Sequence, residues 1–144
     1  VGVIQGGVQV NFVPDTCTIE IDRRLLPGED AAAVHADYGR FFESLNLDAW
    51  QEAPMLADEA LDTGSGEPLV AAASDSLKSL GLNGEPAGVP YGSDASKLAR
   101  VGIPSIIFGP GSIDQAHAAV EWVDCAQVEQ AAAFYQHFLL NFHA

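Results

Sequence analysis

Hydrophobic and polar residues alternate in two short segments near the start of the chain, at 8–12 and 17–21. The turn-forming pair Pro14-Asp15 lies between them. An alternation with a period of two is typical of strands that bury one face, and a turn between two such strands indicates a hairpin. The first part of the chain is therefore predicted to be an antiparallel hairpin.

The spacing of apolar residues becomes helical after Glu29-Asp30, with an apolar face from Val34 to Leu45. The two acidic residues suit the positive N-terminal end of a helix. A further extended stretch at about 47–55 is expected to return to the same sheet. Residues 1–57 are thus predicted to form a β-β-α-β unit, in which a helix covers one face of the sheet.

An acidic stretch rich in small residues, 57–66, is a plausible connector. A helix is predicted to begin at Pro68 and to end before Gly81, because proline suits the first turn of a helix and glycine the position just past its end. A second, short helix is expected from Ser93 or Asp94 through Arg100.

Two further strands and one long helix are predicted in this half. The segment 86–90 is a candidate short strand, and the nearly continuous apolar run 103–108 is typical of a fully buried strand. An amphipathic stripe over 128–142 predicts the final helix. Residues 58–144 are therefore expected to form part of an α/β layer, with too few strands to close a sheet alone.

The charge balance excludes some partners. Six basic residues face 20 acidic ones, for a net charge of −14. Such a chain is poorly suited to nucleic acid, whose phosphates attract Lys and Arg, and to anionic membrane surfaces. No apolar run reaches the ~20 residues of a membrane span, and the opening lacks the pattern of a signal peptide.

The cysteines favour a cytoplasmic protein. Cys17 and Cys125 form no Cys-x-x-Cys pair, which favours buried thiols in such a protein. The chain begins at Val1 and its single methionine is Met55, so we expect it to be part of a longer protein.

His117 is the sharpest candidate for chemistry. It follows a predicted buried strand and the Gly109-Pro110-Gly111 break, in the kind of loop where α/β proteins place their sites. Neutral imidazole is a good zinc ligand, although a structural histidine is the alternative. Glu121 could be a second ligand, could hydrogen-bond the imidazole, or could be a solvated carboxylate.

Three other places could contact a substrate. Gly92-Ser93-Asp94 either caps a helix or offers backbone amides to a carboxylate, and both can hold together. Arg24 could bind a carboxylate through two parallel hydrogen bonds. Asn11 could donate to a developing oxyanion. The alternatives are a surface arginine and an asparagine that stabilises a turn.

Taken in order, these segments resemble the M20 family of metallopeptidases, which includes acetylornithine deacetylases, succinyl-diaminopimelate desuccinylases and carboxypeptidase G2-like enzymes. The segments that resemble the family's lid, or dimerisation, domain are Ile4-Gln5-Gly6-Gly7, Asn11-Phe12-Val13-Pro14-Asp15, Ile21-Asp22-Arg23-Arg24 and Pro27-Gly28-Glu29. Those that resemble the end of its catalytic domain are Tyr91-Gly92-Ser93-Asp94-Ala95, Gly102-Ile103-Pro104, Phe108-Gly109-Pro110-Gly111 and the segment from Ala116 to Val123.

The resemblance implies a zinc-dependent amidohydrolase that cleaves an N-acyl amino acid or small peptide. It implies two zinc ions per site in the intact enzyme, with His117 as the last ligand and Glu121 in a supporting role. Asn11 would be an oxyanion donor reaching across a homodimer formed through the lid. Arg24, Gly92 and Ser93 would bind the substrate.

The chain departs from the family by lacking its His-x-Asp pair, its other acidic ligands and its Glu-Glu pair. The fragment alone is therefore expected to be metal-free and inactive. One alternative is a non-catalytic dimerisation or ligand-binding module. Another is a serine hydrolase using Ser93, Asp94 and His117, which fits poorly because the Gly-x-Ser-x-Gly elbow is missing.

Overall fold

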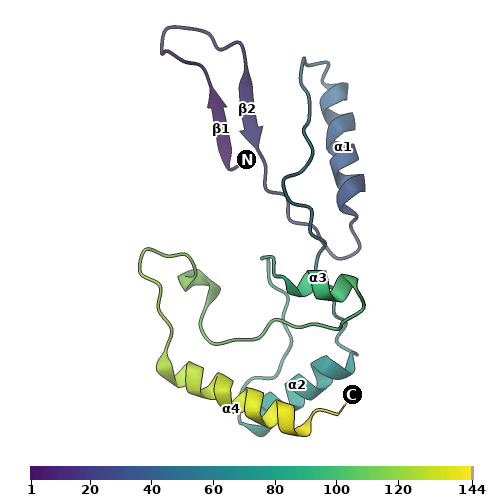
Figure 1. Ribbon diagram of the computed structural model, residues 1–144, viewed down its shortest axis with the longest axis vertical. Helices are drawn as coiled ribbons and strands as arrows, with labels where there is room; N and C mark the ends of the chain where they lie inside the picture. The colour runs from purple at the N-terminus through teal and green to yellow at the C-terminus, as the bar shows by residue number, and fades with distance from the viewer. Residues whose placement is uncertain (144) are drawn as a thin grey trace.

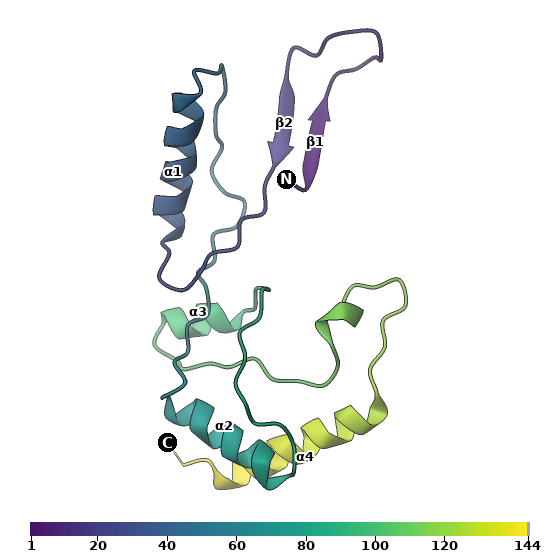
Figure 2. The same ribbon diagram turned by 180° about the vertical axis from the view of Figure 1, so that it is seen from behind.

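A computed structural model describes residues 1–143 of the chain and places its elements in two groups. One group contains a hairpin of β1 (Val3–Gly6) and β2 (Cys17–Glu20), followed by α1 (Ala31–Ser44). The other contains α2 (Pro68–Ser79), α3 (Ala95–Arg100), the 3-10 turn η1 (Ile113–Gln115) and α4 (Cys125–Asn141). Figures 1 and 2 show α3 lying between the hairpin group and the pair formed by α2 and α4.

The hairpin forms as predicted, but its first strand lies earlier in the chain. β1 and β2 pair antiparallel, from Val3 opposite Glu20 to Gly6 opposite Cys17. Gly7 has a φ of +80°, a conformation that ends the strand and that side-chain-bearing residues seldom adopt. The alternating residues 8–12 therefore lie in the loop between the strands and are exposed, so the prediction of a strand there is wrong.

The first helix agrees with its prediction. Asp30 is its N-cap, and the Asp30 carboxylate accepts a hydrogen bond of 2.7 Å from Ala33 N. The segment after α1 runs back beside the helix (Figures 1 and 2) and is held there by side chains. His35 Nε2 lies 2.9 Å from Glu52 O, and Gln51 donates to His35 O at 3.2 Å.

The predicted third strand at 47–55 does not form. These contacts between side chains and backbone replace a ladder with the hairpin, so the expected β-β-α-β unit is reduced to a two-stranded sheet and one helix. Among the described residues the fold is thus a small α+β arrangement, with four α-helices and one antiparallel sheet.

The core lies where α2 packs against α4. Val70 and Ala73 of α2 are buried, as are Ala131 and Phe134 of α4, and they are the only buried hydrophobic residues in the described part of the chain. The ring of Phe108 lies 4.0 Å, centroid to centroid, from that of Phe134. Packing against α4 therefore fixes the segment that leads towards the His117 loop.

The two strands predicted in this half, 86–90 and 103–108, are irregular segments instead. Ser105 is buried, and its carbonyl accepts a hydrogen bond from the Thr63 hydroxyl. Tyr135 of α4 donates to Phe108 O at 3.0 Å. A strand needs a neighbouring backbone to pair with, and here side chains supply only isolated bonds. The α/β layer is therefore absent from the described chain.

Many apolar side chains face outward. Both cysteines are also free and exposed, so the prediction that they are buried is wrong. No helix among residues 1–143 is long and apolar enough to cross a membrane.

Candidate functional site

The turn at residues 92–94, just before α3 (the α3 turn), carries two of the predicted substrate-binding residues, Gly92 and Ser93. Ser93 Oγ accepts a hydrogen bond of 3.2 Å from Ala95 N. The carbonyl of Ser93 accepts from both the amide and the hydroxyl of Ser96, at 3.2 and 3.0 Å. Asp94 is the N-cap residue of α3, as the sequence allowed, but its carboxylate makes no cap bond. The Ser93 hydroxyl, one residue earlier, bonds to the first amide of the helix instead.

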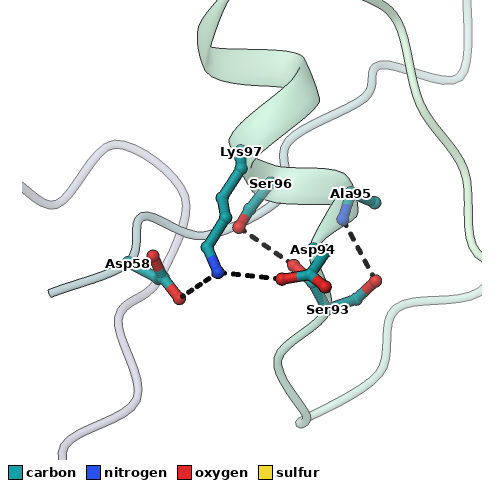
Figure 3. Close-up of polar contacts among 6 residues, drawn as sticks. All are labelled: Asp58, Ser93, Asp94, Ala95, Ser96 and Lys97. Atoms are coloured by element: carbon teal, nitrogen blue, oxygen red, sulfur yellow. Dashed lines mark hydrogen bonds and ion pairs between the residues drawn. The ribbon is translucent and has the colours of Figure 1, made fainter. Parts of the chain in front are cut away.

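Asp94 instead pairs with Lys97, one turn further along α3 (Figure 3). Lys97 Nζ lies 2.8 Å from Asp94 Oδ1 and 3.7 Å from Asp58 Oδ2. The hydrogen bond and charge of Lys97 hold the pKa of Asp94 below its usual value. The hydrogen bond that Lys97 donates to Asp94, followed by the charges of Asp58 and Asp94, raises the pKa of Lys97. Asp94 and Lys97 are therefore both charged at neutral pH.

Arg24 reaches the same turn from the hairpin group. A methyl group built on Gly92 would lie 3.3 Å from Arg24 Nη1, so the guanidinium lies against the Gly92 backbone. The other side of the guanidinium pairs with Asp22, at 2.9 Å from Nε and 2.8 Å from Nη2. The structure therefore brings Arg24 and the turn at 92–93 together.

The neighbouring arginine has different partners. Arg23 Nη2 donates to Glu29 Oε1 at 2.7 Å, and Arg23 Nη1 donates to the carbonyl of Arg24. These contacts hold the loop between β2 and α1. The structure thus assigns the two adjacent arginines different roles: Arg23 stabilises a loop, and Arg24 faces the α3 turn. Their adjacent positions in the sequence do not show this difference.

Asn11 lies elsewhere. It is exposed, in the loop that joins β1 to β2. Figures 1 and 2 show this loop at the end of the hairpin that points away from α3. Within one copy of the chain, Asn11 is therefore not brought to Arg24 and Gly92.

His117 lies in the exposed loop just after η1, with a φ of +60°. This left-handed conformation is uncommon for a residue with a side chain, and such conformations cluster at functional sites. Glu121 Oε2 accepts a hydrogen bond of 3.4 Å from the His117 backbone amide. Glu121 thus contacts the backbone of His117 from an exposed position, where the sequence left open a second ligand, a hydrogen bond to the imidazole or a solvated carboxylate.

The residues present do not make a two-zinc site. No group of three or more His, Cys, Asp or Glu side chains within 1–143 is placed to hold a metal ion. A zinc site in a protein needs three or four ligands, and His117 could supply one.

One hollow in the described part of the chain offers no metal ligand. It is an apolar groove of about 210 Å³ beside α4, lined by Leu69, Ile106, Phe108, Phe134, Tyr135, Phe138 and Leu139. Its only titratable lining group is the Tyr135 hydroxyl, which already donates to Phe108 O. The candidate site is therefore the α3 turn with Arg24, and not this groove.

Sequence reasoning missed Asp58 and Lys97. Lys97 follows Asp94 by three residues, a spacing that favours ion pairs on a helix. The Asp94–Lys97 ion pair could therefore have been predicted from the sequence. Asp58 lies 39 positions before Lys97 in the sequence, in the predicted connector 57–66. Only the folded chain shows that the two are adjacent.

The chain matches the family model of peptidase family M20/M25/M40 over residues 5–141. The chain belongs to this family. The resemblance read from the ordered sequence segments is thus confirmed, and the match includes the hairpin, the α3 turn, the His117 loop and α4.

Several proteins similar to this chain have the names of deacylating enzymes. It is 28% identical to a putative succinyl-diaminopimelate desuccinylase of Mycobacterium tuberculosis, over 94% of this chain and 36% of the relative. It is 25% identical to an acetylornithine deacetylase of Myxococcus xanthus, over 85% of this chain and 32% of the relative. It is also 28% identical to an N-acetyl-L-citrulline deacetylase of Xanthomonas campestris, over 90% of this chain and 35% of the relative.

The chain therefore spans about a third of the length of these relatives. No solved structure matches the chain significantly.

Proposed function

We propose that this chain contributes to a zinc-dependent amidohydrolase that cleaves the amide of an N-acyl amino acid or small peptide. The observation that carries the proposal is the family match over nearly the whole chain. The relatives named above support the acyl amino acid as substrate, because each name describes removal of an acyl group from an amino acid.

In this proposal Arg24 binds the carboxylate of the substrate beside Gly92 and Ser93. A planar guanidinium forms two parallel hydrogen bonds to a carboxylate, which fixes the orientation as well as the position of the bound group. The present partner, Asp22, is itself a carboxylate and is largely exposed, so a substrate carboxylate can take its place. A Cβ at position 92 would lie 3.3 Å from Arg24 Nη1, so a side chain there would require the guanidinium to shift.

His117 would supply one zinc ligand, with Glu121 holding the backbone of its loop. The bond from His117 N to Glu121 Oε2 supports that role for Glu121. Because the described residues do not complete a metal site, no catalytic step is assigned to them. Zinc, when bound in such enzymes, polarises a carbonyl and lowers the pKa of bound water.

The remaining parts of the proposal concern assembly. Residues 1–57 would belong to the lid and residues 58–144 to the catalytic domain, with a cytoplasmic homodimer formed through the lid. Asn11 would then serve the partner's site. Its exposed position on the loop that points away from α3 is consistent with that role.

The test is a hydrolysis assay of the full-length zinc-loaded protein. The substrates are N-acetyl-L-ornithine, N-acetyl-L-citrulline and N-succinyl-L,L-diaminopimelate. Arg24→Met is expected to raise KM about ten- to hundredfold, as for the loss of a charge-assisted hydrogen-bonded pair. For a substrate whose carboxylate has been converted to a carboxamide, Arg24→Met should raise KM much less.

Arg40→Met is the matched control, because Arg40 is an exposed arginine on α1 that pairs with Asp37 three residues away. It should leave KM unchanged. Absence of hydrolysis by the full-length protein would instead favour the alternative, a non-catalytic dimerisation or ligand-binding module. The serine-hydrolase alternative gains no support, since Ser93 Oγ accepts a bond from Ala95 N and none links it to His117 in the described chain.

A further inference from the structure

Lys97 joins two segments that are distant in sequence. Its ammonium lies between Asp94, at the start of α3, and Asp58, in the stretch that leads from α1 to α2 (Figure 3). We propose that Lys97 is a positioning residue, which fixes the turn at 92–94 against Asp58 and so sets the place of Gly92 and Ser93 relative to Arg24. This inference rests on the proposed function, because it concerns the same carboxylate-binding site.

The turn is held from two directions. Arg24, which follows β2, lies against the Gly92 backbone on one side. On the other side, Lys97 ties Asp94 to Asp58. Gly92 and Ser93 thus lie between two cationic side chains that come from different parts of the chain. A shift of the turn would change the distance between its backbone and the Arg24 guanidinium.

Contacts within α3 and its turn do not connect this helix to the segment that contains Asp58. The bonds of Ser93 to Ala95 and Ser96 shape the turn at the start of α3, but they are internal to residues 93–96. The Asp94–Lys97 pair is likewise confined to α3 and its cap. The Lys97–Asp58 contact is the ion pair, among the described residues, that joins α3 to another segment.

The expected effect is moderate and concerns geometry. The Lys97 side chain is 50% exposed, and exposed ion pairs contribute little to global stability and are weakened by salt. Loss of the bridge should therefore leave the protein folded while the turn becomes more mobile. Substrate binding should suffer more than the chemical step, because the residues being positioned contact the substrate carboxylate.

The experiment compares Lys97→Met and Asp58→Asn with the wild type in the full-length protein, using whichever of the three N-acyl amino acids it hydrolyses. Each variant should raise KM about two- to fivefold, with kcat within twofold of the wild type. The double variant should be no worse than either single one, because both remove the same bridge. The difference from wild type should shrink in 1 M salt, and Lys97→Arg should restore most of the KM.

Lys78→Met is the matched control. Lys78 is a similarly exposed lysine on α2, and it lies 4.0 Å from Glu85, away from the α3 turn. It should change neither KM nor kcat. If Lys97→Met raises KM and Asp58→Asn does not, the effect is local to α3 and the proposal is overturned. Wild-type KM values in both variants would overturn it as well.

Hydrogen exchange separates failure of this inference from failure of the proposed function. Measured without substrate by mass spectrometry, amides of residues 91–95 should exchange faster in Lys97→Met and in Asp58→Asn than in the wild type, and unchanged exchange would refute the bridge. If the wild type hydrolyses none of the substrates, the proposed function fails. The exchange result then decides alone whether Lys97 holds the turn.

Discussion

Glu29 holds the chain where it leaves the hairpin. Its two carboxylate oxygens accept hydrogen bonds from Leu26 N at 2.6 Å and from Arg23 Nη2 at 2.7 Å. The hydrogen bond from the Leu26 amide lowers the pKa of Glu29, and burial opposes it to a smaller extent. The charge and hydrogen bond of Arg23 lower this pKa further, so it lies below its ordinary value of 4.5. A depressed folded pKa means that Glu29 stabilises the fold when ionised.

This linkage predicts a pH-dependent effect of Glu29→Gln. The stabilisation should be fully present above the unfolded value of about 4.5 and be lost as pH falls through the lower folded pKa. The variant should therefore melt below the wild type at pH 7, and the difference should narrow as pH falls below 4.5 towards the folded pKa. Thermal unfolding of the full-length protein across this range measures it.

Glu43→Gln on α1 is the control, since no bond to the Glu43 side chain is present in the described chain. It should leave the melting temperature unchanged at pH 7 and at pH 3. A gap for Glu29→Gln that persists undiminished at pH 3 would contradict the assigned role of the ionised carboxylate.

At the scale of elements, α4 organises the second half of the chain. Phe134 is the most buried apolar side chain, at 2% exposed, and its ring lies near those of Phe108, Tyr135 and Phe138. Gln127, on the same helix, accepts from Gly111 N at 2.8 Å. The helix thus holds residues 108–111, the segment that precedes the His117 loop.

Phe134→Ala is expected to destabilise the protein by about 3–5 kcal/mol, the usual cost of removing a buried phenyl ring. Leu139→Ala is the matched control, because Leu139 lies on the same helix and is 75% exposed. It should cost less than about 1 kcal/mol. Urea unfolding of the full-length protein measures both, and equal losses would show that the α4 core is not as described.

Elements that depend on their own sequence were predicted well. The start of α1 at Asp30 and the limits of α2, α3 and α4 follow from caps and helical spacing, which are local. The strands expected at 47–55 and 103–108 were wrong, because a strand needs a partner backbone that its own residues do not specify.

At the scale of the whole molecule, the chain has a small core and a wide apolar surface. Among the described residues only four apolar side chains are buried, whereas Trp50, Trp122 and Leu140 are each at least 60% exposed. A soluble domain seldom exposes this much apolar surface without a partner. The relatives are about three times as long as the matched segment, which is consistent with further protein covering these faces.

Residues 1–144 purified alone are therefore expected to hydrolyse none of the three N-acyl amino acids and to retain little zinc after dialysis. The reason is that His117 offers one ligand and no ligand cluster is formed within 1–143. In the full-length protein, His117→Ala should lower the zinc content, measured by elemental analysis. The exposed His143 provides the control, and His143→Ala should have no effect.

Two zinc ions bound per isolated chain, with hydrolysis, would contradict this expectation. It would show that these residues rearrange into a complete metal site on their own. Unchanged zinc content in the full-length His117→Ala variant would argue that His117 is not a ligand.

The sequence by itself determined the family, the four helices and the candidate residues, because ordered motifs, caps and periodicity are written in neighbouring positions. Only the tertiary structure decided which arginine faces the α3 turn, and that Asp58 lies beside Lys97. Those contacts join segments far apart in the chain, so no pattern of neighbouring residues sets their distances. For the same reason, the sheet edges and apolar faces of this chain depend on neighbours that no local pattern specifies.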